Sequence, residues 1–437
     1  MKIAITFGPM CLTFRGTLEF SGHRQDPRGL TGSEIGFIRI AQELRALGHE
    51  VTAYTNSHES EWEGITIRPL DARGEVDETF DAAISINEPE VLQIMHPKVR
   101  VCEQWLNSFD YCNSGFEAFV DLWVSPSAGH RDFILASEHA TRMTGTGELG
   151  IPYKPEPEKW VGIPLGCDPD RYPQTEKVPG RVVYCSSPDR GLHWVLQEWP
   201  AIKRAVPNAT LKVFYRLQPW IEGFRPKDGA RSPRLWFRNQ LPEYFPPTEP
   251  LLARANYIEE TLKRLSGPEW GITVCDSVSR EQIEREMCEA EVLAYPVDTI
   301  RWSEGFSCTI LEACAARACP VLWDCDAIGG IYCKNCIVHK RGDIKWWRKA
   351  VIACLQDKEI RDAWNKKARA LAEELTWAEH VRRLVCELRY RLPSSTPAEQ
   401  SKTSSPSPAA ESQSSGAKRA RKGRTTTTRP TPTGSTS

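Results

Sequence analysis

Apolar stretches typical of buried strands alternate with amphipathic helical stretches in two separate series along the 437-residue chain. Alternation of this kind predicts a parallel sheet with helices on both faces in each series. The fold class that we predict is therefore α/β, with two doubly wound, Rossmann-like domains. The first series contains predicted strands at residues 2–7, 51–54, 82–86, 100–102 and 122–125, and the second contains predicted strands at residues 182–185, 210–215, 272–275, 291–296 and 320–323.

Two breaks in the pattern divide the chain. Residues 149–179 are rich in proline and lose their periodicity, which is typical of an interdomain linker. Residues 217–251 are rich in Pro, Trp and Arg and predict either a functional flap or a disordered insertion. We place the domains and segments at residues 1–165, at residues 166–376 with the insertion 217–251, at a final helix 377–392, and at a tail 393–437.

The tail has a composition that cannot form a core. It holds twenty Ser/Thr and six Pro, with no aromatic residue and no Val, Ile, Leu or Met, so we expect it to be disordered. Its net charge is +5, whereas the body carries −6. An acidic body argues against a duplex-binding domain, so nucleic-acid binding is expected at most weakly, through the basic run at residues 418–424. The alternative is that this run is only a solvated stretch of charged residues.

The first apolar run ends at Gly8-Pro9, which is too early for the core of a signal peptide, and no uncharged stretch reaches the roughly 20 residues of a membrane helix. We therefore expect a cytoplasmic protein whose 15 Cys are free thiols. The pair Cys333 and Cys336 has the CxxC spacing. With Cys314, Cys319 and Cys325 it leaves a zinc site open as an alternative to buried small side chains.

Two carboxylates around a glycine-containing turn are the main candidates for chemistry. Glu304 is predicted in a loop before a helix and Glu312 two turns inside that helix, so the two lie about 12 Å apart. The free N–H groups of residues 305–308 lie between them and favour an anion. Carboxylate, anion cradle and carboxylate suit a sugar, a diphosphate and a ribose. The alternative is two ordinary Glu residues on an amphipathic helix.

The run from Glu304 to Glu312 resembles the E-x7-E motif of retaining, GT-B-fold glycosyltransferases of family four. The run YCSSPDRGL at residues 184–192 is similar to the opening of that family's donor domain, and IPLGCD at 163–168 is similar to its linker motif. TGSE at 31–34 resembles its glycine-rich N-terminal loop, and the helix from Trp377 resembles the one that crosses back to the first domain. The resemblance implies a GT-B fold with an acceptor domain and a donor domain.

The resemblance also implies roles. Glu304 would bind the transferred sugar, Glu312 the nucleotide ribose, and Arg190 would neutralise the diphosphate without a metal ion. The remaining donor-binding positions are Gly32, Ser186, Ser187 and the backbone amides of Gly305, Phe306 and Ser307. The implied function is transfer of a sugar from a nucleotide-diphospho-sugar to a glycan, lipid or protein acceptor. The nucleotide sugar is a substrate, so no cofactor and no metal are expected.

Three departures from the family pattern weaken the expectation of turnover. The family usually has two basic residues in the 184–192 run, where this chain has Ser186 or Ser187 at the first position. The family commonly has Gly at the position of Arg317, which ends the helix that carries the E-x7-E motif. Many relatives carry a His near the reacting sugar, where this chain offers Asn107 as the equivalent catalytic candidate. Glu88, Glu103 and His130 are fallback polar groups for this role.

Other functions remain as alternatives. The departures leave open a catalytically weakened relative that binds a nucleotide sugar or glycan without transfer. A dehydrogenase is disfavoured because no G-x-G-x-x-G follows either domain's first strand. The Asp pairs at 168/170 and 324/326 match the metal-binding pattern of a different glycosyltransferase fold, but Asp is also common in turns. A scaffold acting through the basic tail is the last alternative.

Overall fold

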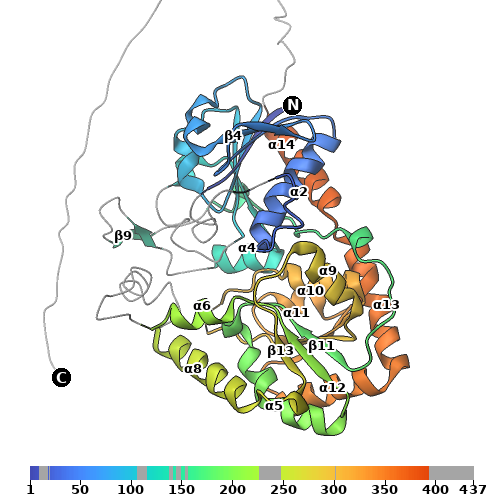
Figure 1. The fold of residues 1–437 in the computed structure, drawn as a ribbon. Helices are drawn as coiled ribbons and strands as arrows, with labels where there is room; N and C mark the ends of the chain where they lie inside the picture. Colours follow the sequence, from blue (N-terminus) through green and yellow to red (C-terminus); the bar gives the residue numbers. More distant parts are fainter. Residues whose placement is uncertain are drawn as a thin grey trace, which may run out of the picture. The chain divides into compact units, whose positions relative to one another are not determined.

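The computed structural model describes residues 1–8, 18, 20–105, 116–136, 141–143, 149–152, 156–225, 248–300 and 302–392. Within them the chain builds two separate parallel sheets with helices packed against both (Figure 1). The α/β class with two doubly wound domains is confirmed. The predicted tail 393–437 lies outside the described residues.

The first sheet has the strand order β10-β7-β6-β5-β1-β2-β4-β3 and is parallel except for the β3–β4 pair. Its central strand β1 carries almost only buried side chains, as expected for a strand covered on both faces. The strands are β1 (Lys2–Phe7), β2 (Glu50–Thr55), β3 (Ser60–Trp62), β4 (Ile65–Pro69), β5 (Ala82–Ile86), β6 (Val99–Glu103), β7 (Leu122–Ser125) and β10 (Trp160–Gly162).

The second sheet has the order β13-β12-β11-β14-β15-β16 and is parallel throughout. A separate antiparallel pair joins β8 (Thr141–Met143) to β9 (Leu149–Pro152). The strands of the second sheet are β11 (Arg181–Tyr184), β12 (Thr210–Val213), β13 (Ile272–Val274), β14 (Val292–Tyr295), β15 (Cys319–Asp324) and β16 (Ile337–Lys340).

Side-chain caps define where several helices begin. Thr31 and Glu34 form a reciprocal capping box at the start of α2, and Ser279 caps α9 by accepting from the amide of Gln282. The helices are α2 (Gly32–Ala46), α4 (Ala128–Leu135), α5 (Leu192–Ala205), α6 (Leu217–Glu222), α8 (Thr248–Arg264), α9 (Arg280–Glu289), α10 (Cys308–Ala316), α11 (Ile328–Tyr332), α12 (Ile344–Gln356), α13 (Lys358–Glu374) and α14 (Trp377–Arg391).

The chain passes between the two sheets twice, and the two passages are bonded to each other. The amide of Cys167 donates to the carbonyl of Leu375 (3.1 Å), and the amide of Trp377 donates to the carbonyl of Cys167 (3.4 Å). Gly166 permits this approach, because a Cβ there would lie 2.2 Å from the Trp377 nitrogen. After the second passage, α14 packs on α2 of the first sheet (Figure 1).

Two of the expected irregular segments contain regular structure. Residues 149–179 include β10, which extends the first sheet beside β7, so the predicted linker begins too early. The predicted insertion 217–251 contains α6, and its last residues belong to α8, which begins at Thr248. Short strands and short amphipathic helices with few apolar positions produce too weak a periodic signal to be recognised. None of the described helices has the length and apolarity to span a bilayer.

Helix α10 ends at Arg317, which adopts the left-handed conformation with φ 56° and ψ 35°. Its amide still satisfies helix-end carbonyls of residues 313 and 314. A residue with a Cβ is strained in this conformation by about 1 kcal/mol relative to glycine. Burial also lowers the pKa of the Arg317 guanidinium, with Arg369 adding to the effect.

We predict that Arg317→Gly raises the free energy of unfolding by about 1 kcal/mol, because it removes the strained Cβ at the end of α10. Urea denaturation compares it with Arg317→Ala, which keeps the Cβ and should give no such gain. Equal stability of the two variants would contradict the conformational explanation.

Candidate functional site

The predicted site residues follow the strands at which the order of the second sheet reverses. That reversal lies between β11 and β14, where ligands of doubly wound sheets bind beyond the carboxyl ends of the strands. Arg190 ends a short 3-10 turn after β11, and Glu304 lies in the loop between β14 and α10. Residues 114 positions apart are thereby brought together.

Glu304 is only 3% exposed and has three groups of partners. Arg190 forms an ion pair with its carboxylate, and the hydroxyl of Tyr295 donates to Oε2 (2.9 Å). Its own amide donates to Oδ2 of Asp326 (2.9 Å), which fixes the loop. Burial raises the pKa of Glu304, while Arg190 acts in the opposite direction. The Glu304 carboxylate and its peptide are thus held in place by residues that lie at the ends of three strands.

Ser186 and Ser187 lie beside this cluster but differ in their contacts. The hydroxyl of Ser186 donates to the Tyr295 hydroxyl (2.8 Å), so it extends the chain of hydrogen bonds that ends on Glu304. The hydroxyl of Ser187 instead bonds Asp189. Sequence reasoning missed Tyr295 and Asp326 as members of the site. Tyr295 is the last residue of β14 and Asp326 lies two positions after β15, and these places at the carboxyl ends of two strands are the signal that could have identified them.

The residues of the predicted anion cradle lie at the amino end of α10. Ser307 caps the helix by accepting from the amide of Ile310, and its carbonyl accepts from the Tyr332 hydroxyl (2.8 Å). Phe306 is buried. The carbonyl of Gly305 accepts from the Ser127 hydroxyl of α4 (2.6 Å), and a Cβ on Gly305 would lie 2.9 Å from the His130 ring. Glycine is therefore required here by the packing of α4.

Gly32 is the first residue of α2 and is exposed. A Cβ placed on it would meet Cβ and Sγ of Cys308, the first residue of α10, at 3.9 Å. The amino ends of two helices, one packed on each sheet, therefore lie close together. Because the positive ends of both helix dipoles converge there, this edge favours a negatively charged group.

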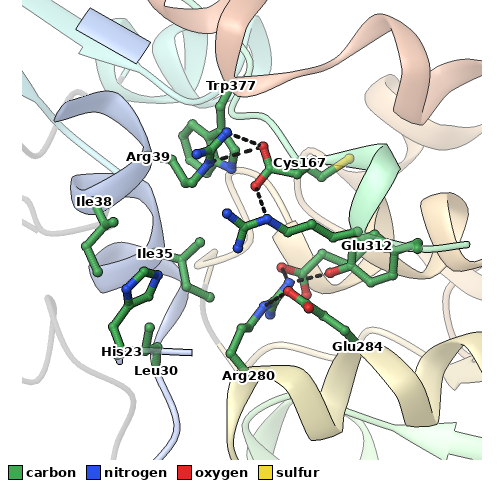
Figure 2. A pocket seen from close by; sticks show the side chains of 13 residues that line it. His23, Leu30, Ile35, Ile38, Arg39, Cys167, Arg280, Glu284, Glu312 and Trp377 are labelled. Carbon is green, nitrogen blue, oxygen red and sulfur yellow. Dashed lines mark hydrogen bonds and ion pairs between the residues drawn. The ribbon is translucent and has the colours of Figure 1, made fainter. Parts of the chain in front are cut away.

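Glu312 lies about one turn into α10, rather than the two turns predicted, and is 7% exposed. Arg280 pairs with its Oε1, and the same guanidinium donates to the hydroxyl of Tyr172. Burial raises the pKa of Glu312, and Arg280 opposes this shift. These side chains line a small cavity of about 10 Å³ between the two halves of the structure, closed on its other side by apolar residues of α2 (Figure 2).

The Cys and Asp patterns considered for metals have other partners. Cys314 lies 3.4 Å from Cys336 and Cys319 lies 3.7 Å from Cys354, all four buried thiols. Asp168 pairs with Arg39 (2.7 Å), and Asp326 accepts from backbone amides. Within the described part of the chain, no three His, Cys, Asp or Glu side chains are grouped to hold a metal ion.

Asn107 lies outside the described residues, but the three fallback groups are placed. Glu103 contacts His380 (3.3 Å) and accepts from the indole of Trp105, so it supports the crossing helix α14. Glu88 lies against Gly8 at the end of β1. His130 alone reaches the Glu304 loop. Its ring stacks on Trp302, and neither ring nitrogen has a hydrogen-bond partner among the described residues.

Burial lowers the pKa of His130 to about 3, whereas an unfolded chain has a value near 6.5. Between these values the unfolded state binds a proton that the folded state excludes. We predict that wild type loses up to about 1.4 kcal/mol per pH unit relative to His130→Phe as the pH falls below 6.5. Urea unfolding of both proteins at pH 7, 6 and 5 measures this, and a pH-independent difference would contradict it.

No family model matches this chain, and no curated protein is significantly similar to it in sequence. Solved structures do match. AviGT4, a glycosyltransferase involved in avilamycin A biosynthesis, aligns with 90% of this chain and 98% of its own at 15% identity and a TM-score of 0.56. Sucrose-phosphate synthase from Thermosynechococcus elongatus aligns with 89% and 98% at 12% identity and a TM-score of 0.57.

A third match is Anabaena HepE, whose structure holds UDP-glucose. It aligns with 89% of this chain and 100% of its own, at 12% identity and a TM-score of 0.58. Each alignment covers about nine-tenths of this chain, which is more than one sheet and its helices could supply. The chain therefore has the GT-B fold of these glycosyltransferases.

Proposed function

We propose that the protein is a glycosyltransferase that moves a sugar from a nucleotide-diphospho-sugar to a glycan, lipid or protein acceptor. The observation that carries the proposal is the meeting of the α2 and α10 amino ends, with Gly32 facing Cys308 and Arg190 on the same edge. The positive ends of two helix dipoles at one edge favour binding of a diphosphate. The GT-B fold agrees with this, and UDP-glucose bound to HepE is a ligand of that chemistry.

We assign the residue roles from the motif resemblance, and the positions of these side chains support the assignment. Glu304, oriented by Tyr295, accepts hydroxyls of the transferred sugar, and Glu312 accepts ribose hydroxyls. The backbone amides at Gly305, Phe306 and Ser307, with Gly32 opposite, bind the phosphates. When the anomeric bond breaks, the diphosphate oxygen takes the electron pair, and Arg190 stabilises that charge without requiring a metal ion. The acceptor hydroxyl forms the new bond, and its proton leaves with the diphosphate.

Retention of configuration and membership of family four are proposed from the resemblance of residues 304–312 to the E-x7-E motif. The acceptor is proposed to enter beyond the carboxyl ends of the strands of the first sheet. Asn107 is proposed as the catalytic residue that acts on the reacting sugar. The described cysteines are free thiols, which is consistent with a reducing, cytoplasmic location.

A second candidate is a protein that binds a nucleotide sugar without transferring it. Arg190 is already paired with Glu304, and the position where the family has a further basic residue is occupied by Ser186 or Ser187, which bond Tyr295 and Asp189 respectively. A single guanidinium would therefore have to serve both the carboxylate and the leaving group. Measurement of transfer separately from binding distinguishes the two candidates.

We predict that UDP-, GDP- or ADP-sugars raise the thermal midpoint of the protein, and that one of them is hydrolysed slowly or transferred. Glu304→Gln removes the charge but can keep the bond to Tyr295, so it should retain nucleoside diphosphate binding and lose about 100-fold in release of the sugar. Arg190→Lys should lose a similar factor, because it cannot reproduce the planar fork.

The matched control is Glu374→Gln, an exposed carboxylate at the end of α13, which should behave as wild type. Stabilisation by nucleotide sugars without release of nucleoside diphosphate from any of them would select the binding protein. No stabilisation by any nucleotide sugar would overturn both candidates.

A further inference from the structure

Residues 20–31, which we call the docking segment, lie between β1 and α2 and contact the amino end of α9 in the second half of the chain. The carbonyl of Arg24 accepts from the amide of Glu281 (3.2 Å), and the side chain of Gln25 bonds Glu281. Gly29, at φ 68°, lies so close to α9 that a Cβ would be 2.5 Å from the Val278 carbonyl oxygen. Only glycine permits both this conformation and this approach.

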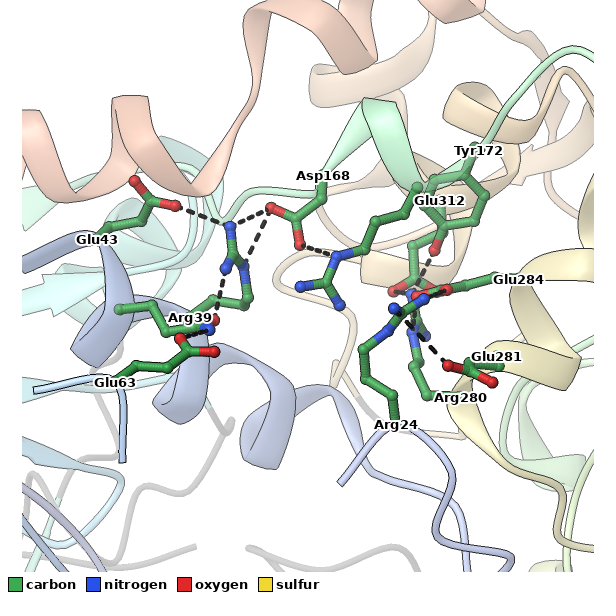
Figure 3. A network of polar contacts seen from close by, with 12 residues as sticks. Arg24, Arg39, Glu43, Glu63, Asp168, Tyr172, Arg280, Glu281, Glu284 and Glu312 are labelled. Carbon is green, nitrogen blue, oxygen red and sulfur yellow. Dashed lines mark hydrogen bonds and ion pairs between the residues drawn. The ribbon is translucent and has the colours of Figure 1, made fainter. Parts of the chain in front are cut away.

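A chain of alternating charges runs from the docking segment to the proposed ribose site (Figure 3). Arg24 bonds Oε2 of Glu284 (2.6 Å), and Oε1 of the same carboxylate accepts from Nε of Arg280 (2.9 Å). Arg280 in turn pairs with Glu312. The side chains of Glu284, Arg280 and Glu312 are at most 10% exposed, whereas that of Arg24 is 33% exposed. Three of the four charges are therefore poorly screened by water.

We propose that Arg24 is a positioning residue for the nucleotide ribose, acting through Glu284 and Arg280 to hold Glu312, so that docking of residues 20–31 on α9 completes the ribose site. This inference rests on the proposed function. Arg24 belongs to the first half of the chain and Glu312 to the second, so the chain of charges couples closure of the two halves to nucleotide binding.

The coupling follows from how Arg280 is shared. Its guanidinium serves two carboxylates, Glu284 and Glu312, and the negative charge of Glu284 raises the pKa of Glu312. Arg24 compensates that charge from the other side of Glu284. Without Arg24, two carboxylates compete for one guanidinium, and a buried ion-pair network with a missing partner is strongly disfavoured.

The arrangement also leaves part of Glu312 available. Arg280 donates to Oε1 of Glu312, while Oε2 makes no hydrogen bond to any residue that the structure describes. A carboxylate oxygen of this kind accepts ribose hydroxyls well, provided that the carboxylate stays ionised and in place. Tyr172, whose hydroxyl accepts from Arg280, fixes the guanidinium from the side of the linker.

The test is calorimetric binding of UDP, GDP and ADP and of the 2′,3′-dideoxy analogue of whichever binds. Wild type should lose affinity for the dideoxy analogue. Arg24→Met should lower the affinity for the ordinary nucleotide about five- to tenfold but change the affinity for the dideoxy analogue by less than twofold. Loss of Arg24 and loss of the ribose hydroxyls remove the same interaction, so their effects should not add. Arg24→Lys, which keeps the charge, should recover most of the affinity.

The matched control is Arg382→Met in α14, since Arg382 is exposed and pairs with Glu379 of the same helix (2.6 Å). It should leave both affinities unchanged. Equal weakening of the ordinary and dideoxy nucleotides by Arg24→Met would overturn the inference and reduce Arg24 to a structural contact. Absence of binding of any nucleoside diphosphate to wild type would instead overturn the proposed function.

Discussion

The burial of the Glu304 carboxylate is the constraint on which the site depends. An ionised carboxylate removed from water costs several kcal/mol unless it is paired and hydrogen-bonded. Arg190 supplies the charge, Tyr295 a hydroxyl, and Asp326 fixes the peptide that carries it. These partners come from the ends of three neighbouring parallel strands, β11, β14 and β15. The sheet must therefore form in its correct order before the carboxylate can be accommodated.

The opposing half of the site is positioned by packing rather than by charge. Ser127 and His130 of α4 lie directly on Gly305, and Trp302 stacks on His130. A neutral imidazole without described partners is a poor surface to bury, because each unsatisfied nitrogen costs free energy. Two opposing contributions therefore determine the free energy of contact between the two halves. The ionic chain through Arg24 favours the closed arrangement, and the desolvation of His130 opposes it.

The sequence predicted the parts of this structure that have strong local signals. Strands β1, β5 and β14 are continuous apolar runs, α14 has a periodic apolar stripe, and caps such as Thr31 and Ser279 mark where helices begin. Elements with weaker signals were missed. No element was assigned between residues 324 and 376, where β16, α12 and α13 lie, since α13 is highly charged and β16 is short.

The composition of the candidate site was predictable only in part. Glu304, Glu312 and Arg190 have motif neighbours along the chain, but their partners are set by tertiary structure. Arg280 reaches Glu312 across 32 residues, and Tyr172 reaches Arg280 across 108. No local pattern marks such pairings. The roles of these residues stay predictions, and Asn107 lies outside the residues that the structure describes.

The double passage between the sheets has a consequence for the order of folding during synthesis. Helix α14 covers α2 of the first sheet, and its Trp377 is 2% exposed, yet it is separated from β10 by the entire second sheet. Domains usually fold as the ribosome releases them, the N-terminal one first. Here the first sheet leaves the ribosome while the face of α2 that α14 will cover is still exposed. Helix α14 can cover it only after about 200 further residues have been translated.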